Sequence, residues 1–195
     1  MIRVQGLDFH VRDIGDKQPA LVFLHYWGGT GRTWDLVIRE VAGRHRCVAP
    51  DLRGPAPPVP IAAPREQREA MLESYQSPAG VEFALSILTA RQLSPELRQQ
   101  VIDDTLSGSP AAKAAWTQAG MTLDISDIVG NINVPTTVIV GDADKVETEP
   151  FLRRELGPRI SGTEFIVLPG VGHLSPLEAP SELAAAITTA ISKIR

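Results

Sequence analysis

The feature that most constrains the fold is an alternation of strand-like and helix-like segments that occurs in two separate parts of the chain. A continuous apolar run occupies residues 20–24, and shorter strand-like segments occupy residues 46–49 in the first part and residues 136–140 and 164–168 in the second. The run at 20–24 is typical of a strand buried on both faces of a parallel sheet. Because segments with helical spacing follow the runs, the pattern predicts an α/β fold with a mostly parallel sheet flanked by helices.

Local signals place further elements around these runs. Residues 2–13 alternate around a turn at 5–8 and predict a hairpin. Thr33 is expected to cap a helix that ends at Gly43. Residues 150–156 predict another helix, and the last helix is expected to bury one apolar face. That face carries Leu183, Ile187, Ile191 and Ile194.

The middle of the chain has a different character. Residues 55–60 are rich in proline, which excludes a central strand or a helix interior. Residues 64 to about 117 then show several short amphipathic patterns and no strand signal. Three of these begin with a serine followed by proline, the arrangement of an N-cap before the first helical position. The pairs are Ser77-Pro78, Ser94-Pro95 and Ser109-Pro110. The pattern predicts an all-helical insert.

Composition excludes several classes of protein. The chain has 19 Lys and Arg against 23 Asp and Glu, with 43% hydrophobic and 22% charged residues, close to the averages of soluble globular proteins. No basic cluster indicates nucleic-acid binding, and no apolar stretch reaches the ~20 residues that span a bilayer. Cys47 is the only cysteine and is expected to be a buried thiol. We therefore expect a cytoplasmic protein with neither nucleic acid nor membrane as a partner.

The candidate chemistry lies on loops that follow the apolar runs, where catalytic groups of open α/β sheets are found. The first loop carries His25, Tyr26, Trp27 and the glycines Gly28 and Gly29, whose backbone N–H groups could face an oxyanion. The second carries Asp142 and Asp144, and the third carries His173 between small residues. A histidine held by a carboxylate is the orienter-and-base half of a catalytic triad. Neither a metal-ligand spacing nor a phosphate-binding glycine loop is present, so we expect no metal and no cofactor.

Four motifs occur in an order that resembles the α/β-hydrolase family. They are His25-Tyr26-Trp27-Gly28-Gly29, Asp51-Leu52-Arg53-Gly54, Gly141-x-x-Asp144 and Gly170-Val171-Gly172-His173. Val134-Pro135-Thr136, and Glu178 with Pro180, also fit the family's C-terminal pattern. The resemblance divides the chain into an N-terminal part of the hydrolase core at 1–54, a helical lid at 55–130 and a C-terminal part of the core at 131–195.

The resemblance also implies roles for single residues. Asp144 matches the triad acid, His173 matches the general base, and the backbone N–H of Trp27 matches an oxyanion-hole donor. His25 matches the first residue of the family's His-Gly motif, with Tyr26 in place of the glycine and Gly28 nearby in the pocket. For His25, a structural hydrogen-bonding role and a catalytic role both stay open. His10 and His45 are expected at the surface.

The nucleophile of this family is missing from the sequence. The chain contains no Gly-x-Ser-x-Gly, and no equivalent with Asp or Cys. Gly54 runs directly into Pro55 where the family carries its elbow segment, which implies that central strands 5 and 6 and their helices are absent. Two strands, two helices and their loops come to roughly 56 residues. The strands that flank the gap should then pair directly or become exposed edges, and we expect either marginal stability or homo-oligomerisation through those edges.

No other serine is expected to replace the nucleophile, which is therefore unknown. The serines are expected to serve at helix caps instead. They are Ser74, Ser77, Ser86, Ser94, Ser107, Ser109 and Ser175.

The resemblance implies a serine hydrolase of small esters or related acyl compounds, acting on a small-molecule substrate. The alternative is a catalytically inactive deletion product or binding protein with a residual pocket. The motifs also resemble cofactor-free haloperoxidases and carbon–carbon bond hydrolases, which the sequence does not separate.

Overall fold

The N-terminal strands form two small units. In this computed structural model, residues 2–4, 7–52, 64–122, 124 and 126–194 are described. β1 (Ile2–Val4) pairs antiparallel with β2 (Leu7–Phe9), and β3 (Val11–Ile14) pairs antiparallel with β5 (Cys47–Pro50). The predicted hairpin is therefore shorter than expected, because β3 leaves it to join β5. Part of its predicted turn, residues 5–6, lies outside the described residues.

The strand predicted at residues 20–24 is only two residues long in the structure. β4 (Leu21–Val22) pairs parallel with β5, which places the strands of this sheet in the order β3-β5-β4. Phe23 is buried, but Val22 is 64% exposed and Leu24 is 57% exposed. The expectation of burial on both faces is therefore wrong here. Phe23 packs into the core on one side, whereas nothing among the described residues covers Val22 and Leu24 on the other.

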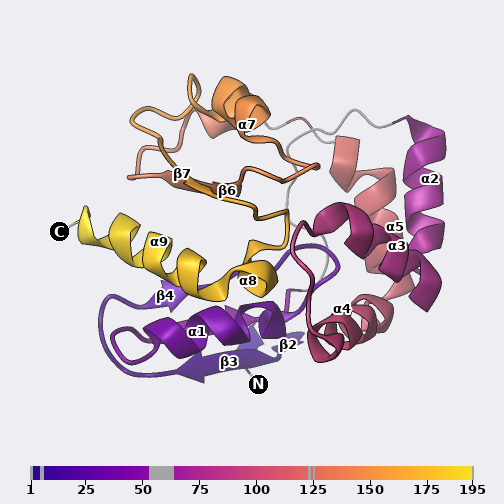
Figure 1. The fold of residues 1–195 in the computed structure, drawn as a ribbon, viewed down its shortest axis with the longest axis horizontal. Coiled ribbons are helices and arrows are strands. Elements are labelled where there is room, and N and C mark those ends of the chain that lie inside the picture. Colours follow the sequence, from indigo (N-terminus) through magenta and orange to yellow (C-terminus); the bar gives the residue numbers. More distant parts are fainter. Residues whose placement is uncertain (1, 5–6, 53–63, 123, 125, 195) are drawn as a thin grey trace.

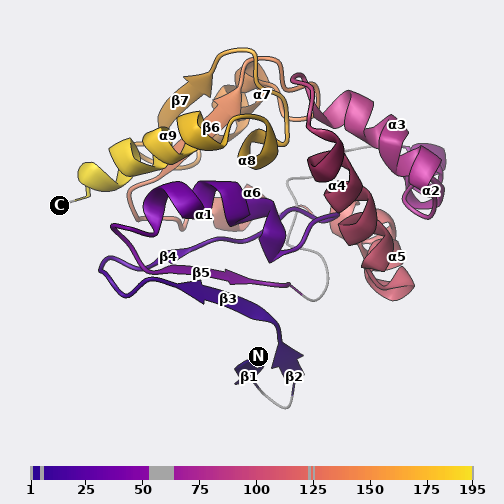
Figure 2. The same ribbon diagram turned by 60° about the horizontal axis from the view of Figure 1, so that its bottom comes forward.

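The C-terminal strands form a separate parallel pair. β6 (Thr137–Gly141) and β7 (Glu164–Leu168) pair in register from Thr137 opposite Glu164 to Gly141 opposite Leu168. β4 and β6 are not hydrogen-bonded to each other, and Figures 1 and 2 show the two sheets apart in space. Within the described ranges no strand lies between them. The expected mostly parallel sheet is thus divided at the position where the prediction omitted two strands.

Two helices join the divided sheets into one core. α1 (Asp35–Val41) and α9 (Pro180–Ser192) pack against each other, with α1 next to the sheet of β3, β5 and β4 and α9 next to β6 and β7 (Figure 2). Their shared core is a cluster of apolar residues from both parts of the chain. It includes Phe23, Val37, Ile38, Val41, Cys47, Ala49, Leu168, Val171, Leu183 and Ala184. The burial of Cys47 is confirmed.

Two local predictions at these helices are wrong. α1 is preceded by the 3₁₀-helix η1 (Gly31–Trp34), whose cap is Thr30 rather than Thr33, because Thr30 Oγ1 accepts the Arg32 N–H at 3.2 Å. Ile194 lies beyond the end of α9 and is exposed, since the apolar face stops contributing to the core where the helix ends.

The middle of the chain forms a layer of helices on one side of the molecule (Figure 1). This helical layer comprises α2 (Arg65–Ser74), α3 (Pro78–Leu88), α4 (Pro95–Ser107) and α5 (Pro110–Gln118). The three Ser-Pro caps are confirmed: each serine oxygen accepts a backbone N–H three residues later, at 3.1 to 3.3 Å. The layer has its own apolar cluster, which also includes Leu174 before α8 (Ser175–Glu178) and Leu177 within it. The cluster contains Val81, Leu85, Leu93, Val101, Ile102, Leu174 and Leu177.

Short elements complete the chain between the helical layer and β7. They are η2 (Gly120–Thr122), α6 (Ser126–Val129) and α7 (Glu149–Leu156). The helix predicted at 150–156 begins one residue earlier than expected, after Thr148. In Figure 1, α7 lies beside β6 and β7.

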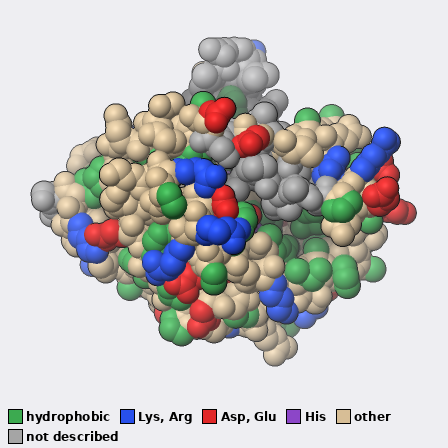
Figure 3. All heavy atoms as spheres, turned by 90° about the horizontal axis from the view of Figure 1, so that it is seen from above, with side chains coloured by type: hydrophobic (Ala, Val, Ile, Leu, Met, Phe, Trp, Pro, Cys, Tyr) green, Lys and Arg blue, Asp and Glu red, His purple; other side chains and the backbone are tan. Residues whose placement is uncertain are grey.

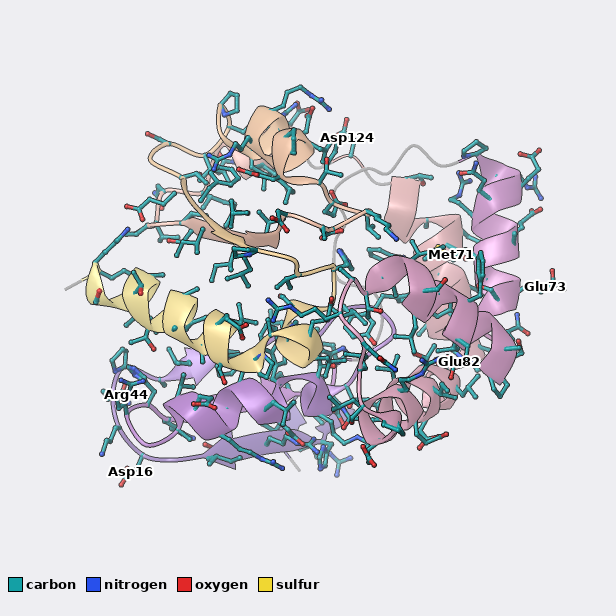
Figure 4. All side chains as sticks on the ribbon, in the orientation of Figure 1. Asp16, Arg44, Met71, Glu73, Glu82 and Asp124 are labelled. Atoms are coloured by element: carbon teal, nitrogen blue, oxygen red, sulfur yellow. The ribbon has the colours of Figure 1, made fainter. Side chains whose placement is uncertain are left out.

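The surface carries mixed charge. On the face shown in Figure 3, Lys and Arg side chains are interspersed with Asp and Glu. In Figure 4, Glu73 and Glu82 project from the helical layer, while Asp16 and Arg44 lie at the opposite end of the molecule. The described part of the chain contains no helix long and apolar enough to cross a membrane.

The prediction of a surface position for His45 is wrong. This side chain is buried, and its Nδ1 lies 3.0 Å from the carbonyl oxygen of Pro19. The loop before β4 therefore folds over it. His10 is exposed as expected, with its Nδ1 3.1 Å from Asp51 Oδ2.

Candidate active site

The structure brings His173 and Asp144 together at the carboxyl ends of β6 and β7. Asp144 follows β6 and His173 follows β7, so the parallel register of the strands places both loops at one edge. Nδ1 of His173 lies 2.9 Å from Oδ2 of Asp144. The Asp144 side chain is 6% exposed and the His173 side chain 27% exposed. A buried carboxylate thus holds a histidine that still reaches solvent.

The surroundings of Asp144 decide which atom of His173 is available. Burial raises the pKa of Asp144, but the hydrogen bond and charge of His173, with the backbone N–H groups of Glu147 and Val146, outweigh burial and hold it below its usual value. Those N–H groups donate to Oδ1 at 3.0 and 2.8 Å. An ionised carboxylate only accepts hydrogen bonds, so Nδ1 of His173 carries the proton. Nε2 is then free to accept a proton from a reactant.

The two loops are held in contact through their backbones. A Cβ atom on Gly141 would lie 1.9 Å from the carbonyl oxygen of Val171, so only glycine permits this approach. Ala143 N–H donates to the same oxygen at 3.1 Å. Asp142 Oδ1 accepts the Gly170 N–H at 2.6 Å. Asp142 therefore links the loops and does not contact the histidine ring, in keeping with its expected place as a neighbour of the acid.

Glu178 connects the histidine loop to the helical layer, a role that the sequence motif did not reveal. Its buried carboxylate accepts four backbone N–H groups, from Ala90, Arg91, Gly172 and Leu174, at 2.8, 2.9, 3.0 and 3.1 Å. The His173 N–H also donates to the Leu88 carbonyl at 2.8 Å. The sequence signals at this position were the match of Glu178 to the family's C-terminal pattern and its place as an acidic residue between the apolar Leu177 and Ala179.

Glu147 is a second carboxyl group beside the pair and was also missed. Its Oε2 is buried and has no hydrogen-bond partner among the described residues. Burial raises the pKa of Glu147, the charge of His173 lowers it in part, and the charge of Asp144 raises it further. His173 therefore has two acids nearby: Asp144, whose ionised form is stabilised by hydrogen bonds, and Glu147, whose ionised form is disfavoured by burial.

The glycine-rich loop after β4 leaves backbone donors free. A Cβ atom on Gly29 would lie 2.6 Å from Thr33 Oγ1 and 2.7 Å from the Tyr26 ring, so the loop requires glycine there. Tyr26 packs against the apolar cluster of the helical layer. Among the described residues, the N–H groups of Trp27 and Gly28 donate no hydrogen bond. Free N–H groups on a tight loop are what an oxyanion hole requires.

His25 is fully engaged in structural hydrogen bonds. Its Nε2 accepts the Leu52 N–H at 2.8 Å, and its Nδ1 lies 2.8 Å from the Tyr26 carbonyl oxygen. Because Nε2 accepts, Nδ1 carries the proton and donates it to the carbonyl. The ring therefore ties the loop after β4 to the loop after β5. Of the two roles left open for His25, this geometry favours the structural one.

A cavity of ≈ 340 Å³ lies between the glycine-rich loop and the helical layer. The Trp27 ring stands 4.5 Å from the Tyr75 ring and 6.1 Å from the Trp116 ring, centre to centre. Burial raises the pKa of Tyr75 to about 12, so its hydroxyl stays protonated. His173 and Asp144 are not part of the lining. The lining consists of His25, Trp27, Gly28, Gly29, Leu52, Tyr75, Asp104, Thr105, Gly108, Ser109, Ala112 and Lys113.

No described serine is hydrogen-bonded to His173. The hydroxyls of Ser74, Ser86 and Ser107 donate to carbonyls three residues earlier, so these serines do not cap helices as expected. Ser175 is the first residue of α8 and makes no capping hydrogen bond, so the capping expectation is wrong there too. The junction of Gly54 and Pro55 lies outside the described residues. Within the described chain, no group of three His, Cys, Asp or Glu side chains could hold a metal ion.

Comparison with known proteins identifies the fold. Neither a protein-family model nor a curated protein sequence matches the chain. An esterase from Exiguobacterium antarcticum superposes with a TM-score of 0.82 at 17% identity, over 94% of this chain and 95% of that one. A malate-bound thermophilic esterase from Thermogutta terrifontis gives 0.79 at 19% identity, over 95% and 93% of the chains. A bromoperoxidase from Bacillus anthracis gives 0.77 at 14%, over 94% and 95%.

The chain has an α/β-hydrolase fold. The fold class predicted from the motif order is confirmed. The strand order β3-β5-β4, followed by β6 and β7 in a second sheet, is consistent with an α/β-hydrolase fold shortened at its centre.

Proposed function

We propose that the protein is a hydrolase of small esters or related acyl compounds in which Asp144 and His173 form the acid–base pair. The observation that carries this proposal is the 2.9 Å hydrogen bond between His173 Nδ1 and Asp144 Oδ2, which leaves Nε2 as a base. The free N–H groups of Trp27 and Gly28 support it, because they suit the negative oxygen of a tetrahedral intermediate.

The proposed reaction uses water as the attacking group, because no serine nucleophile is assigned. His173 Nε2 takes a proton from water as the water oxygen bonds to the acyl carbon, and the carbonyl electrons move to the oxygen. The intermediate then collapses, the bond to the leaving group breaks, and His173 returns the proton to that group. Asp144 keeps the imidazole in the required tautomer throughout.

The test is the turnover of p-nitrophenyl acetate. His173→Ala should lower the rate by about 10²-fold or more, since general acid–base catalysis contributes that much. His10→Ala is the matched control, because His10 is an exposed histidine outside the site. A rate unaffected by His173→Ala would contradict the proposal. If a fluorophosphonate probe labels a serine, that serine and not water is the nucleophile.

A second candidate is a catalytically inactive binding protein with a residual pocket. The observation that favours it is that neither His173 nor Asp144 lines the cavity beside Trp27. This candidate predicts saturable ligand binding together with background hydrolysis. The encoding DNA and the intact mass across Gly54 and Pro55 would show whether a natural central segment carries the nucleophile.

A further inference from the structure

The cavity contains a buried amine. Lys113 on α5 is 8% exposed and lines the cavity. Its Nζ donates to the carbonyl oxygens of Tyr75 at 3.1 Å and Leu106 at 3.4 Å. An ammonium group has three N–H donors. Among the described residues the third has no partner, so it is available to a ligand.

No carboxylate neutralises Lys113 in the described structure. Asp104 is the only acid among the described residues of the lining, and it is paired with Arg32, whose Nε and Nη2 donate to Oδ1 at 3.2 and 2.5 Å. Thr30 Oγ1 donates to its other oxygen at 3.1 Å. The stretch that follows Leu52, residues 53–63, contains no Asp or Glu.

An unneutralised buried cation is costly, which makes Lys113 a poor choice for packing alone. Burial lowers the pKa of Lys113, as expected for an amine that lacks an anion. Ser109 and Ala112, in the cap and first turn of the nine-residue helix α5, line the same cavity. The positive end of this helix adds potential of the same sign as the ammonium.

We propose that this cavity binds the carboxylate of a small acyl compound, with the Lys113 ammonium as its counter-ion. The apolar part of the ligand lies against the rings of Trp27 and Tyr75. Together with the proposed function, on which this step rests, the inference defines the substrate class as esters that carry a carboxylate. The volume of ≈ 340 Å³ suits a small ligand, since such sites span about 300–1,000 Å³.

A carboxylate fits better than a phosphate. The described lining supplies one cation without an acidic partner, which balances one negative charge. A phosphate dianion would bring a second negative charge close to Asp104, where like charges repel.

The experiment measures binding by calorimetry, independently of turnover. 3-Phenylpropanoate is titrated into the wild-type protein, with 3-phenylpropanamide as its neutral analogue and inorganic phosphate as a third probe. We expect the carboxylate to bind at least tenfold more tightly than the amide. Equal affinity for the two, or tighter binding of phosphate, would overturn the inference. This comparison needs no variant and therefore holds even if substitutions unfold the chain.

A variant pair then assigns the contact. Lys113→Met keeps an unbranched side chain one atom shorter and removes the charge. We expect it to weaken 3-phenylpropanoate binding at least tenfold without changing the affinity for the amide. Lys17→Met is the control, because Lys17 is an exposed lysine on another part of the surface. Unchanged carboxylate affinity in folded Lys113→Met would refute the role of Lys113. Selective binding without esterase turnover would contradict only the proposed function, and turnover without selectivity would contradict only this inference.

Discussion

Asp144 is the residue on which the candidate site depends most. Three hydrogen bonds converge on its carboxylate, from His173 and from two backbone N–H groups. A depressed pKa for a carboxyl group means that ionisation stabilises the folded state. That stability is present above the ordinary value of 3.8 and is lost as the pH falls through the lower folded-state pKa.

We expect Asp144→Ala to lower the free energy of unfolding by about 2 kcal/mol at pH 7, the scale of a hydrogen bond to a charged group. Urea unfolding from pH 7 to pH 2 measures the difference, which should shrink at the acid end. Asp16→Asn is the control because Asp16 is exposed. A difference that stays constant with pH would show that the charge of Asp144 does not stabilise the fold.

The pKa of Glu147 shifts in the opposite direction to that of Asp144, so its ionisation destabilises the folded state. Its pKa is raised, so the ionised form is disfavoured in the folded protein, and the cost is fully present above the folded pKa. We expect Glu147→Gln to raise the free energy of unfolding at pH 7 by about 1 kcal/mol, within the cost of an unpartnered buried group. The gain should vanish as the pH falls below the ordinary value of 4.5. Thermal unfolding at several pH values measures it, and an equal gain at all of them would contradict the assignment.

At the scale of elements, Glu178 links α8 and the histidine loop to the junction of α3 and α4. A carboxylate that accepts four backbone N–H groups is not replaced by an amide, because the amide nitrogen would face donors. We expect Glu178→Gln to lower the free energy of unfolding by about 3 kcal/mol. Hydrogen exchange should accelerate at Ala90 and Arg91.

The matched control is Glu182→Gln on α9. Glu182 Oε1 accepts from Arg91 at 2.8 Å, but this pair is exposed and should contribute little. Equal effects of the two substitutions would show that Glu178 is an ordinary surface acid.

At the scale of the whole molecule, the divided sheet leaves apolar residues at its strand edges that no described residue covers. Val22 in β4 and Leu24 just after it are the exposed residues concerned. Open apolar edges favour pairing with another chain, so we propose that the protein self-associates through β4. Sedimentation velocity should show a concentration-dependent dimer or larger species.

The double substitution Val22→Lys and Leu24→Lys should shift this equilibrium toward monomer by at least tenfold. Phe83→Ser is the control, because Phe83 is equally exposed on α3, in the helical layer. A wild-type protein that is monomeric at all concentrations and unfolds sharply and reversibly would contradict the proposal.

Some predictions that depend on interactions between residues close in sequence were confirmed, whereas those that depend on distant residues were often wrong. The three Ser-Pro helix starts were predicted because a cap joins atoms three residues apart. His45 and Ile194 were misplaced because their exposure depends on distant packing, over the loop at Pro19 in one case and past the end of α9 in the other. Thr30 is the N-cap in place of Thr33, because a 3₁₀-helix precedes α1 and begins after Thr30.

By itself the sequence determined the fold class, the order of the motifs and the absence of a Gly-x-Ser-x-Gly motif, since these depend on residue types and spacing along the chain. Only the tertiary structure showed that both ring nitrogens of His25 take part in hydrogen bonds and that Glu178 joins the helical layer to the histidine loop. It also showed that Lys113 lines the cavity with no carboxylate among the described residues to neutralise it. Each of these depends on groups that lie far apart in sequence and meet only when the chain folds. The burial of a side chain and the partners of its polar atoms depend on these tertiary contacts, so they cannot be read from residue spacing alone.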